Sequence, residues 1–203
     1  MKNISNIIEI LQESYPEARC QLEYEEPWQL LFATILSAQC TDDRVNMVTR
    51  ELYRKYTSLE AFADACQREL EQDIRSCGFY HNKAANIIGC AKKLVEEYGG
   101  EVPKDIDELT ELPGVGRKTA NVLRGNYYHI PSVVVDTHVK RVSGRLGLTD
   151  SEDPVKIEQD LMKILPEESW IDFNHLAMAH GRKVCKAPTP KCEICPLRAE
   201  CEK

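Results

Sequence analysis

The most chemically suggestive residues of this chain lie in two short runs. Residues 112–118 read Leu-Pro-Gly-Val-Gly-Arg-Lys, and residues 135–138 read Val-Asp-Thr-His. Glycine has no Cβ and adopts positive φ at little steric cost, so we expect Gly114 and Gly116 to form a turn that points successive backbone N–H groups at a phosphate oxygen. Such a turn is typical of proteins that bind nucleic acid.

Lys118 follows this turn, at the start of a predicted helix, where unpaired amides and the helix dipole place partial positive charge beside the ammonium. That charge, the neighbouring Arg117 and the burial that we expect there favour the neutral amine, which is the form that attacks carbon. Asp136 opposes this effect, so its role would be to accept the lysine proton or to stabilise positive charge on the substrate. Two alternatives stay open, namely a phosphate contact for Lys118 and a helix cap for Asp136.

Four closely spaced cysteines lie near the end of the chain. They are Cys185, Cys192, Cys195 and Cys201, in a C-x6-C-x2-C-x5-C pattern. A compact run of single cysteines favours a [4Fe-4S] cluster over zinc, because structural zinc sites usually come as two close pairs separated by a longer spacer. Zinc remains the alternative. The five other cysteines show no ligand spacing, and we expect small, mostly buried thiols there.

Composition indicates a soluble protein of one or two domains, since the 203 residues are 42% hydrophobic and 29% charged. No run is apolar and long enough for export or membrane insertion, and nine cysteines favour a reducing compartment, so we expect a cytoplasmic protein. The net charge of −7 argues against indiscriminate binding of polyanions. Residues 112–148, however, hold six basic side chains and one acidic side chain. This basic stretch coincides with the glycine turn, which favours a phosphate-binding surface over a merely solvated helix face.

Apolar residues recur at helical spacing almost throughout the chain, for example over residues 4–11 and 87–95. We predict helix starts at Asp42, Ser58, Asp105 and Asp153. A further helix is expected from about His81 to the glycine pair at Gly99. Only residues 133–135, three valines, favour a strand, and three residues cannot form a sheet. The sequence therefore predicts an all-α protein of roughly ten helices.

Taken together, these motifs resemble endonuclease III, a family of bifunctional DNA glycosylases and abasic-site lyases in the helix-hairpin-helix superfamily. The resemblance runs over nearly the whole length. It includes residues 37–42, 78–84, 112–118, 135–141 and 180–182, the last of which leads into the four cysteines. A glycine hairpin alone is a weak signal, but the hairpin lysine, the aspartate and the cysteine run in this order are highly specific together.

The resemblance implies a two-lobed all-α fold. A six-helix barrel with the hairpin would occupy residues 21–132, and a lobe holding a [4Fe-4S] cluster would consist of residues 1–20 and 133–203. DNA would lie across the cleft between them, with Lys118 and Asp136 at its mouth.

By the same resemblance, the chain would remove oxidised pyrimidines from double-stranded DNA through attack of Lys118 on C1′. It would then cleave the abasic site by β-elimination. We expect damaged duplex DNA as the partner, a monomeric protein and no association with membranes. Two rival interpretations are a monofunctional glycosylase of the adenine-mismatch type, whose members lack the hairpin lysine, and a non-catalytic DNA-binding module.

The resemblance also assigns individual residues. The cluster ligands would be Cys185, Cys192, Cys195 and Cys201. The residues expected to bind DNA are Gln39, Phe79, Gly114, Val115, Gly116, Arg117, His138, Lys140, Arg141, Lys186 and Lys191. Gln39 would fill the space left by an everted nucleotide, and Phe79 would wedge the opposite strand. The chain departs from the family pattern at Phe79, where leucine is common, and at Cys40, where threonine or alanine is more usual.

Overall fold

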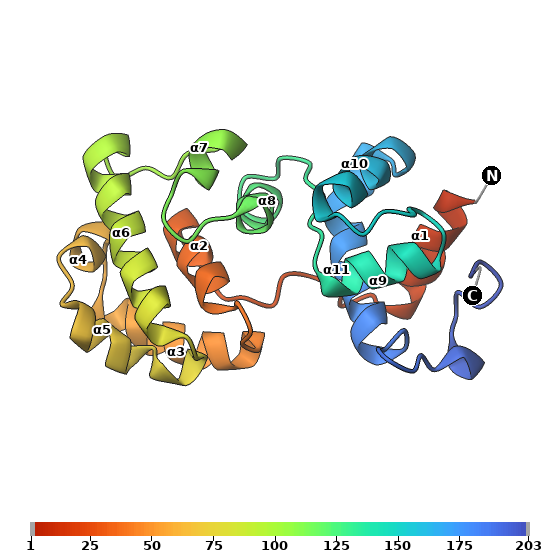
Figure 1. Cartoon of the computed structure of the whole chain (residues 1–203), viewed down its shortest axis with the longest axis horizontal. Helices are drawn as coiled ribbons and strands as arrows, with labels where there is room; N and C mark the ends of the chain where they lie inside the picture. The colour runs from red at the N-terminus through yellow and green to blue at the C-terminus, as the bar shows by residue number, and fades with distance from the viewer. Residues whose placement is uncertain (1–2, 202–203) are drawn as a thin grey trace. The chain divides into compact units, whose positions relative to one another are not determined.

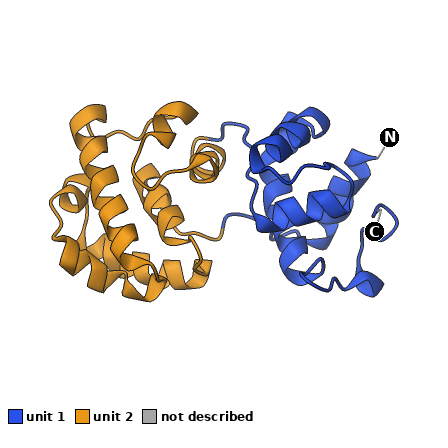
Figure 2. Cartoon of the chain, in the orientation of Figure 1, with its two compact units in different colours: residues 1–20, 129–203 blue, residues 21–128 orange. Residues whose placement is uncertain are grey.

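The computed structural model describes residues 3–201, and every regular element within this range is a helix (Figure 1). The predicted all-α class is confirmed, and residues 133–135 form an irregular connection. None of the described helices is both long and apolar enough to cross a membrane. The chain divides into two compact units (Figure 2): unit 2 is residues 21–128, and unit 1 is residues 1–20 together with residues 129–203. Unit 2 thus ends at Tyr128, whereas the lobe expected from the resemblance extends to residue 132.

Unit 2 is built around a helix that is buried on nearly all sides. Its helices are α2 (Pro27–Leu36), α3 (Asp42–Lys55), α4 (Leu59–Ala63), α5 (Gln67–Asp73), the 3-10 helix η1 (Arg75–Cys77), α6 (Tyr80–Tyr98), α7 (Ile106–Thr110) and α8 (Arg117–Asn126). Helix α2 is almost entirely apolar, as expected for a central helix. Phe32 of α2 meets Phe62 of α4 edge-on, with ring centroids 5.0 Å apart. The long helix α6 packs against α2, α4 and α5.

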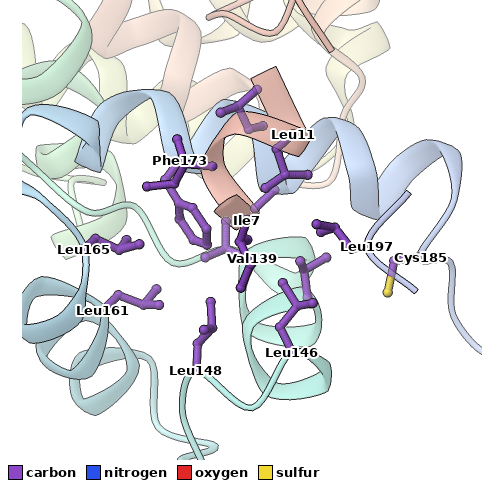
Figure 3. Packing of buried hydrophobic residues seen from close by; sticks show 14 of the residues in the cluster. Ile7, Leu11, Val139, Leu146, Leu148, Leu161, Leu165, Phe173, Cys185 and Leu197 are labelled. Atoms are coloured by element: carbon purple, nitrogen blue, oxygen red, sulfur yellow. The ribbon is translucent and has the colours of Figure 1, made fainter. Parts of the chain in front are cut away.

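Unit 1 joins the N-terminal helix to the C-terminal third of the chain. Its helices are α1 (Ile4–Ser14), α9 (Thr137–Arg145), α10 (Pro154–Ile164), η2 (Glu167–Ser169), α11 (Trp170–Lys183) and η3 (Cys192–Ile194). Ile7 and Leu11 of α1 are completely buried in a cluster with Val139 and Phe173 (Figure 3). Cys185 also belongs to this cluster, so the apolar core of unit 1 extends to the cysteine-rich segment.

The helix ends agree with the sequence at most of the predicted positions. Ser58, Asp105 and Asp153 each accept a backbone N–H with their side chains at the starts of α4, α7 and α10. The prediction for α3 was wrong, because the cap is Thr41 and Asp42 is the first helical residue. There the carboxylate still lies favourably beside the positive end of the helix dipole. Gly99 ends α6 with a φ of 62°, in the left-handed conformation that glycine adopts without a Cβ clash.

Candidate active site and nucleic-acid interface

Helices α7 and α8 and the turn between them form the predicted hairpin. Leu112 and Val115 are buried, and the N–H of Val115 donates to the carbonyl oxygen of Leu112 at 3.1 Å, which closes the turn. Gly114 has a φ of 76°, and a Cβ there would lie 2.7 Å from the Cβ of Asn86 on α6. Only glycine satisfies both the dihedral angle and this close approach.

Gly116 plays a different part from the one expected. Its φ is −95°, so the prediction that both hairpin glycines take positive φ was wrong. Gly116 is the N-cap of α8, it supplies no capping side chain, and a Cβ there would meet nothing within 4 Å. The start of α8 therefore combines open space with uncapped first-turn amides, an arrangement suited to a phosphate group.

Lys118 is the second residue of α8 and is exposed to solvent, as is Arg117. The burial expected from the sequence is therefore wrong for this side chain. An exposed amine at a helix N-terminus is accessible to a DNA backbone that docks on the hairpin. Lys118 belongs to unit 2 and Asp136 to unit 1, so their pairing stays a prediction.

Asp136 is half-buried and is the N-cap of α9. Its Oδ1 accepts the backbone N–H of His138 at 2.8 Å and that of Val139 at 2.7 Å. The capping alternative considered for this residue is confirmed. Both bonds end on the same oxygen, and neither uses Oδ2. One carboxylate can thus start the helix through Oδ1 and act on a substrate through Oδ2.

Two of the predicted DNA contacts on α9 are engaged within unit 1. The Arg141 guanidinium donates to the carbonyl oxygens of Cys185 at 2.9 Å and Gly181 at 3.0 Å. Its Nη2 lies 3.0 Å from Nδ1 of His138, and burial of the imidazole lowers the pKa of His138, which favours the neutral ring. Arg141 thereby ties the start of α9 to the segment that follows α11.

The remaining basic side chains of unit 1 differ in their surroundings. The Nζ of Lys140 lies 2.7 Å from Oε2 of Glu152 and donates to the carbonyl oxygen of the same residue. Lys186 and Lys191 are exposed in the segment that contains the first two cysteines. Lys186 and Lys191, both expected to bind DNA, therefore face solvent, whereas Lys140 already has a carboxylate partner.

Gln39 and Phe79 are both exposed and both have left-handed backbone conformations. Their φ angles are 54° and 48°. Phe79 is 62% exposed at the N-cap of α6, and Gln39 lies in the turn between α2 and α3. Positive φ is uncommon for residues other than glycine and costs on the order of 1–3 kcal/mol, so the surrounding structure must hold these two turns in place.

Lys83 is a residue that the sequence reasoning missed. It lies on α6 and is only 5% exposed, and its Nζ donates to three backbone carbonyl oxygens in the turns that carry Gln39 and Phe79. The available signal was a lysine on the apolar side of a helical pattern that continues through Ala84 and Ile87.

The four predicted metal ligands lie around one cavity in unit 1. The cavity has a volume of about 240 Å³, and its wall includes all four cysteines together with Val142, Leu146 and Val184. All nine cysteines of the chain are free thiols. Within residues 3–201, no three potential ligands converge closely enough to hold a single metal ion. The cavity thus brings together four soft sulfur donors.

Side chains from α9 and α11 approach these cysteines. Arg145 donates from Nη1 to Sγ of Cys185 at 3.3 Å, and Cys201 donates from its Sγ to the carbonyl oxygen of Arg145 at 3.4 Å. Nε2 of His180 lies 3.7 Å from Sγ of Cys195. Burial lowers the pKa of His180 to about 4, which favours a neutral imidazole there at pH 7.

Comparison with known proteins relates these features to one family. Residues 32–167 match the HhH-GPD superfamily of base excision DNA repair proteins. Endonuclease III of Synechocystis sp. is 51% identical over 198 residues, which are 97% of this chain and 90% of that protein. The chain belongs to the endonuclease III family. It is accordingly an enzyme of base excision DNA repair, with the DNA glycosylase and abasic-site lyase activities of that family.

Solved endonuclease III structures also share its fold. A non-covalent endonuclease III–DNA complex has a TM-score of 0.93 at 46% identity, and the match covers 98% of this chain and 94% of that chain. A trapped endonuclease III–DNA covalent intermediate, an estranged-adenine complex, has a TM-score of 0.93 at 45% identity, with 100% and 97% covered.

Two variants of Asp136 distinguish the contribution of its capping hydrogen bonds to stability from the contribution of its negative charge. Asp136→Ala removes the acceptor of two amides at the start of α9 and is expected to lower the free energy of unfolding by about 1 kcal/mol, as measured by urea denaturation. Asp136→Asn retains an oxygen acceptor, so we expect its stability to stay within about 0.5 kcal/mol of the parent protein. Equal losses in both variants would show that the charge, and not the capping bonds, stabilises α9.

Proposed function

We propose that this endonuclease III family member removes oxidised pyrimidines from double-stranded DNA by attack of Lys118 on C1′ and then cleaves the abasic site by β-elimination. The observation that carries the proposal is that Lys118, the second residue of α8, is exposed directly after the glycine turn. That one of the similar solved structures is a trapped endonuclease III–DNA covalent intermediate supports a covalent route.

The first step is extraction of the damaged nucleotide, because a side chain cannot reach C1′ within a stacked duplex. We assign the insertion into the resulting gap to Gln39 and the wedge in the opposite strand to Phe79. Both side chains are exposed, on turns of the same unit. An aromatic ring such as that of Phe79 can stack between bases.

Attack then forms a bond between C1′ and the Lys118 nitrogen, while the base leaves with the electron pair of the glycosidic bond. Asp136 accepts the proton lost by the amine and stabilises positive charge on the deoxyribose, through the oxygen that does not cap α9. Since Lys118 is exposed in this chain, the docked duplex supplies the exclusion of water around the reacting amine.

The C1′–O4′ bond then breaks as the nitrogen lone pair forms a C1′=N double bond, and O4′ leaves as a hydroxyl with the proton that Asp136 returns. The Schiff base formed in this way acidifies the C2′ proton. Loss of this proton forms a double bond between C2′ and C3′ and expels the 3′ phosphate, which breaks the strand. One lysine therefore accounts for both base removal and strand cleavage.

Phosphate binding is assigned to both units. In unit 2, the backbone amides of residues 114–116 and the side chain of Arg117 face a strand that docks on the hairpin. In unit 1 the assigned contacts are His138, Lys140, Lys186 and Lys191. Lys140 must exchange Glu152 for phosphate in order to take part. We revise the expected contact by Arg141 to a positioning role, because its guanidinium is already hydrogen-bonded to backbone carbonyls.

We further propose that the chain binds a [4Fe-4S] cluster. The ligands are Cys185, Cys192, Cys195 and Cys201. Thiolates suit both iron–sulfur clusters and zinc. The compact spacing of the four cysteines and the cavity of about 240 Å³ that they line support a cluster over a single zinc ion. When bound, the cluster supplies a covalent brace for the segment that carries Lys186 and Lys191. The protein would act in the cytoplasm, at the DNA.

Removal of the Lys118 amine tests the proposed reaction. On a panel of duplexes containing oxidised pyrimidines, the parent protein should release the base and cleave the strand, and Lys118→Ala should be slower by roughly 10³-fold or more in both steps. Lys92→Ala, which changes another exposed lysine of unit 2, is the control and should retain the parent rate. Base release without strand cleavage by the parent protein would instead indicate a monofunctional glycosylase, and binding without either product would indicate a non-catalytic module.

Metal and sulfide analysis of the purified protein tests the cluster. We expect about four iron atoms and four acid-labile sulfides per chain. Cys192→Ser should lower both contents and the visible absorption together. One zinc atom per chain without sulfide would contradict the assignment.

A further inference from the structure

Lys83 is unusual because its charge is buried. Across residues 3–201 it is the only buried lysine or arginine. Burial lowers the pKa of Lys83, an effect that the nearby thiols of Cys77 and Cys40 oppose. Burial of an ammonium destabilises the folded state unless all of its N–H groups are hydrogen-bonded. The acceptors of these bonds therefore indicate the role of the side chain.

Three backbone carbonyls satisfy the Lys83 ammonium. Its Nζ donates to the carbonyl oxygens of Leu36 at 2.8 Å and Ala38 at 2.8 Å, and to that of Cys77 at 2.9 Å. Leu36 is the last residue of α2, and Cys77 is the last residue of η1. Carbonyls at helix ends lack partners within the helix and carry partial negative charge, so a cation suits them.

These carbonyls belong to the two turns that present Gln39 and Phe79. Ala38 directly precedes Gln39, and only Gly78 separates Cys77 from Phe79. The backbone N–H of Lys83 also donates to the carbonyl oxygen of Phe79, at 3.1 Å. Lys83 therefore contacts the Phe79 turn through both its backbone and its side chain, and the Gln39 turn through its side chain.

The strained conformations of these turns explain why the bonds from Lys83 matter. Gln39 and Phe79 both have positive φ, which persists in residues other than glycine only where surrounding bonds hold it. Both side chains are exposed and make no contribution to the buried core. A shared ammonium between the two turns fixes the distance from one exposed tip to the other.

We propose that Lys83 is a positioning residue that sets the spacing between Gln39 and Phe79, so that both side chains enter a damaged duplex together. The inference rests on the proposed function, which places these two side chains in the opened base stack. Insertion of a preformed pair loses less conformational entropy than insertion of two independently mobile turns. Lys83 itself touches neither DNA nor the reacting atoms and acts only through the two turns.

The test compares two substrates with the full-length holoenzyme. Lys83→Met removes the ammonium and keeps a long side chain. Base release from a lesion-containing duplex requires insertion, and we expect single-turnover rates to fall by roughly 100-fold, as for a misplacement of about 1 Å. Cleavage of single-stranded abasic DNA has no base stack to open, and we expect its rate to stay within about twofold because Lys118 is unchanged. Lys92→Met, on the exposed side of the same helix, is the matched control for both substrates.

A second measurement asks whether Lys83 acts through the two tips. In the background of Gln39→Ala and Phe79→Ala together, Lys83→Met should cause little further loss on the duplex. A 2-aminopurine placed opposite the lesion should brighten on binding of the parent protein, because its base is unstacked, and this increase should be lost in Lys83→Met. If Lys83→Met unfolds below the assay temperature, Lys83→Gln, which retains two N–H donors, is used in its place. For this variant we expect a smaller loss of rate on the duplex and again an almost unchanged rate on single-stranded abasic DNA.

The outcomes separate this inference from the proposed function. If the parent protein neither releases the base from the lesion-containing duplex nor cleaves abasic DNA, the proposed function fails. If the parent protein is active and Lys83→Met equals it on the duplex, the positioning role is overturned. Equal losses on both substrates, or a full additional loss in the Gln39 and Phe79 background, would likewise overturn it in favour of a general structural role.

Discussion

The close contact between α6 and the glycine turn is the constraint on which the rest of unit 2 depends. A Cβ at Gly114 would lie 2.7 Å from the Cβ of Asn86, and a Cβ at Gly89 would lie 3.3 Å from Cγ of Pro113. A side chain at either glycine would force the neighbouring residue to shift, so the hairpin and α6 pack in direct contact and fix each other's position. Lys83 lies one turn before Asn86 on this side of α6. The same helix that seats the hairpin therefore also holds the Gln39 and Phe79 turns.

In unit 1, α9 plays the role that α6 plays in unit 2, because several segments are bonded to it. The first turn of this helix is held by Oδ1 of Asp136, and Arg141 connects it to the backbone of Cys185 on the cavity of the four cysteines. The guanidinium of Arg141 thus links the proposed cluster site to the helix that begins at Asp136, the proposed proton acceptor. In both units a buried or half-buried cation bonded to carbonyl oxygens holds the functional segments in place.

The sequence predicted the features that local chemistry decides. Helical periodicity gave the all-α class, and side-chain caps such as Asp105 and Asp153 begin helices where expected, because capping depends on a few consecutive residues. Asp42 was misplaced by one residue because Thr41 competes for the same position. The hairpin was located correctly, but the conformation of Gly116 depends on how α8 begins and not on glycine alone.

Features set by tertiary packing could not be read from the sequence. The exposure of Lys118 depends on which side of α8 faces the remainder of unit 2, and its neighbours in sequence do not decide this. The role of Lys83 was missed because its three acceptors are the backbone carbonyls of residues 36, 38 and 77. Every residue has a backbone carbonyl, so the residue types at these positions do not reveal the contact. The cavity around the cysteines could be expected from their spacing. Its apolar wall could not, because it comes from Val142 of α9 and from Leu146 and Val184, which directly follow α9 and α11.

The central claim is that the Lys118 nitrogen becomes bonded to C1′ of the damaged nucleotide. The most direct measurement is borohydride reduction of the reacting complex, followed by proteolysis and mass spectrometry of the cross-linked peptide. The account predicts that the reduced deoxyribose is attached to Lys118 in the peptide that contains the start of α8. An adduct on another amine, or no adduct from an active protein, would contradict it.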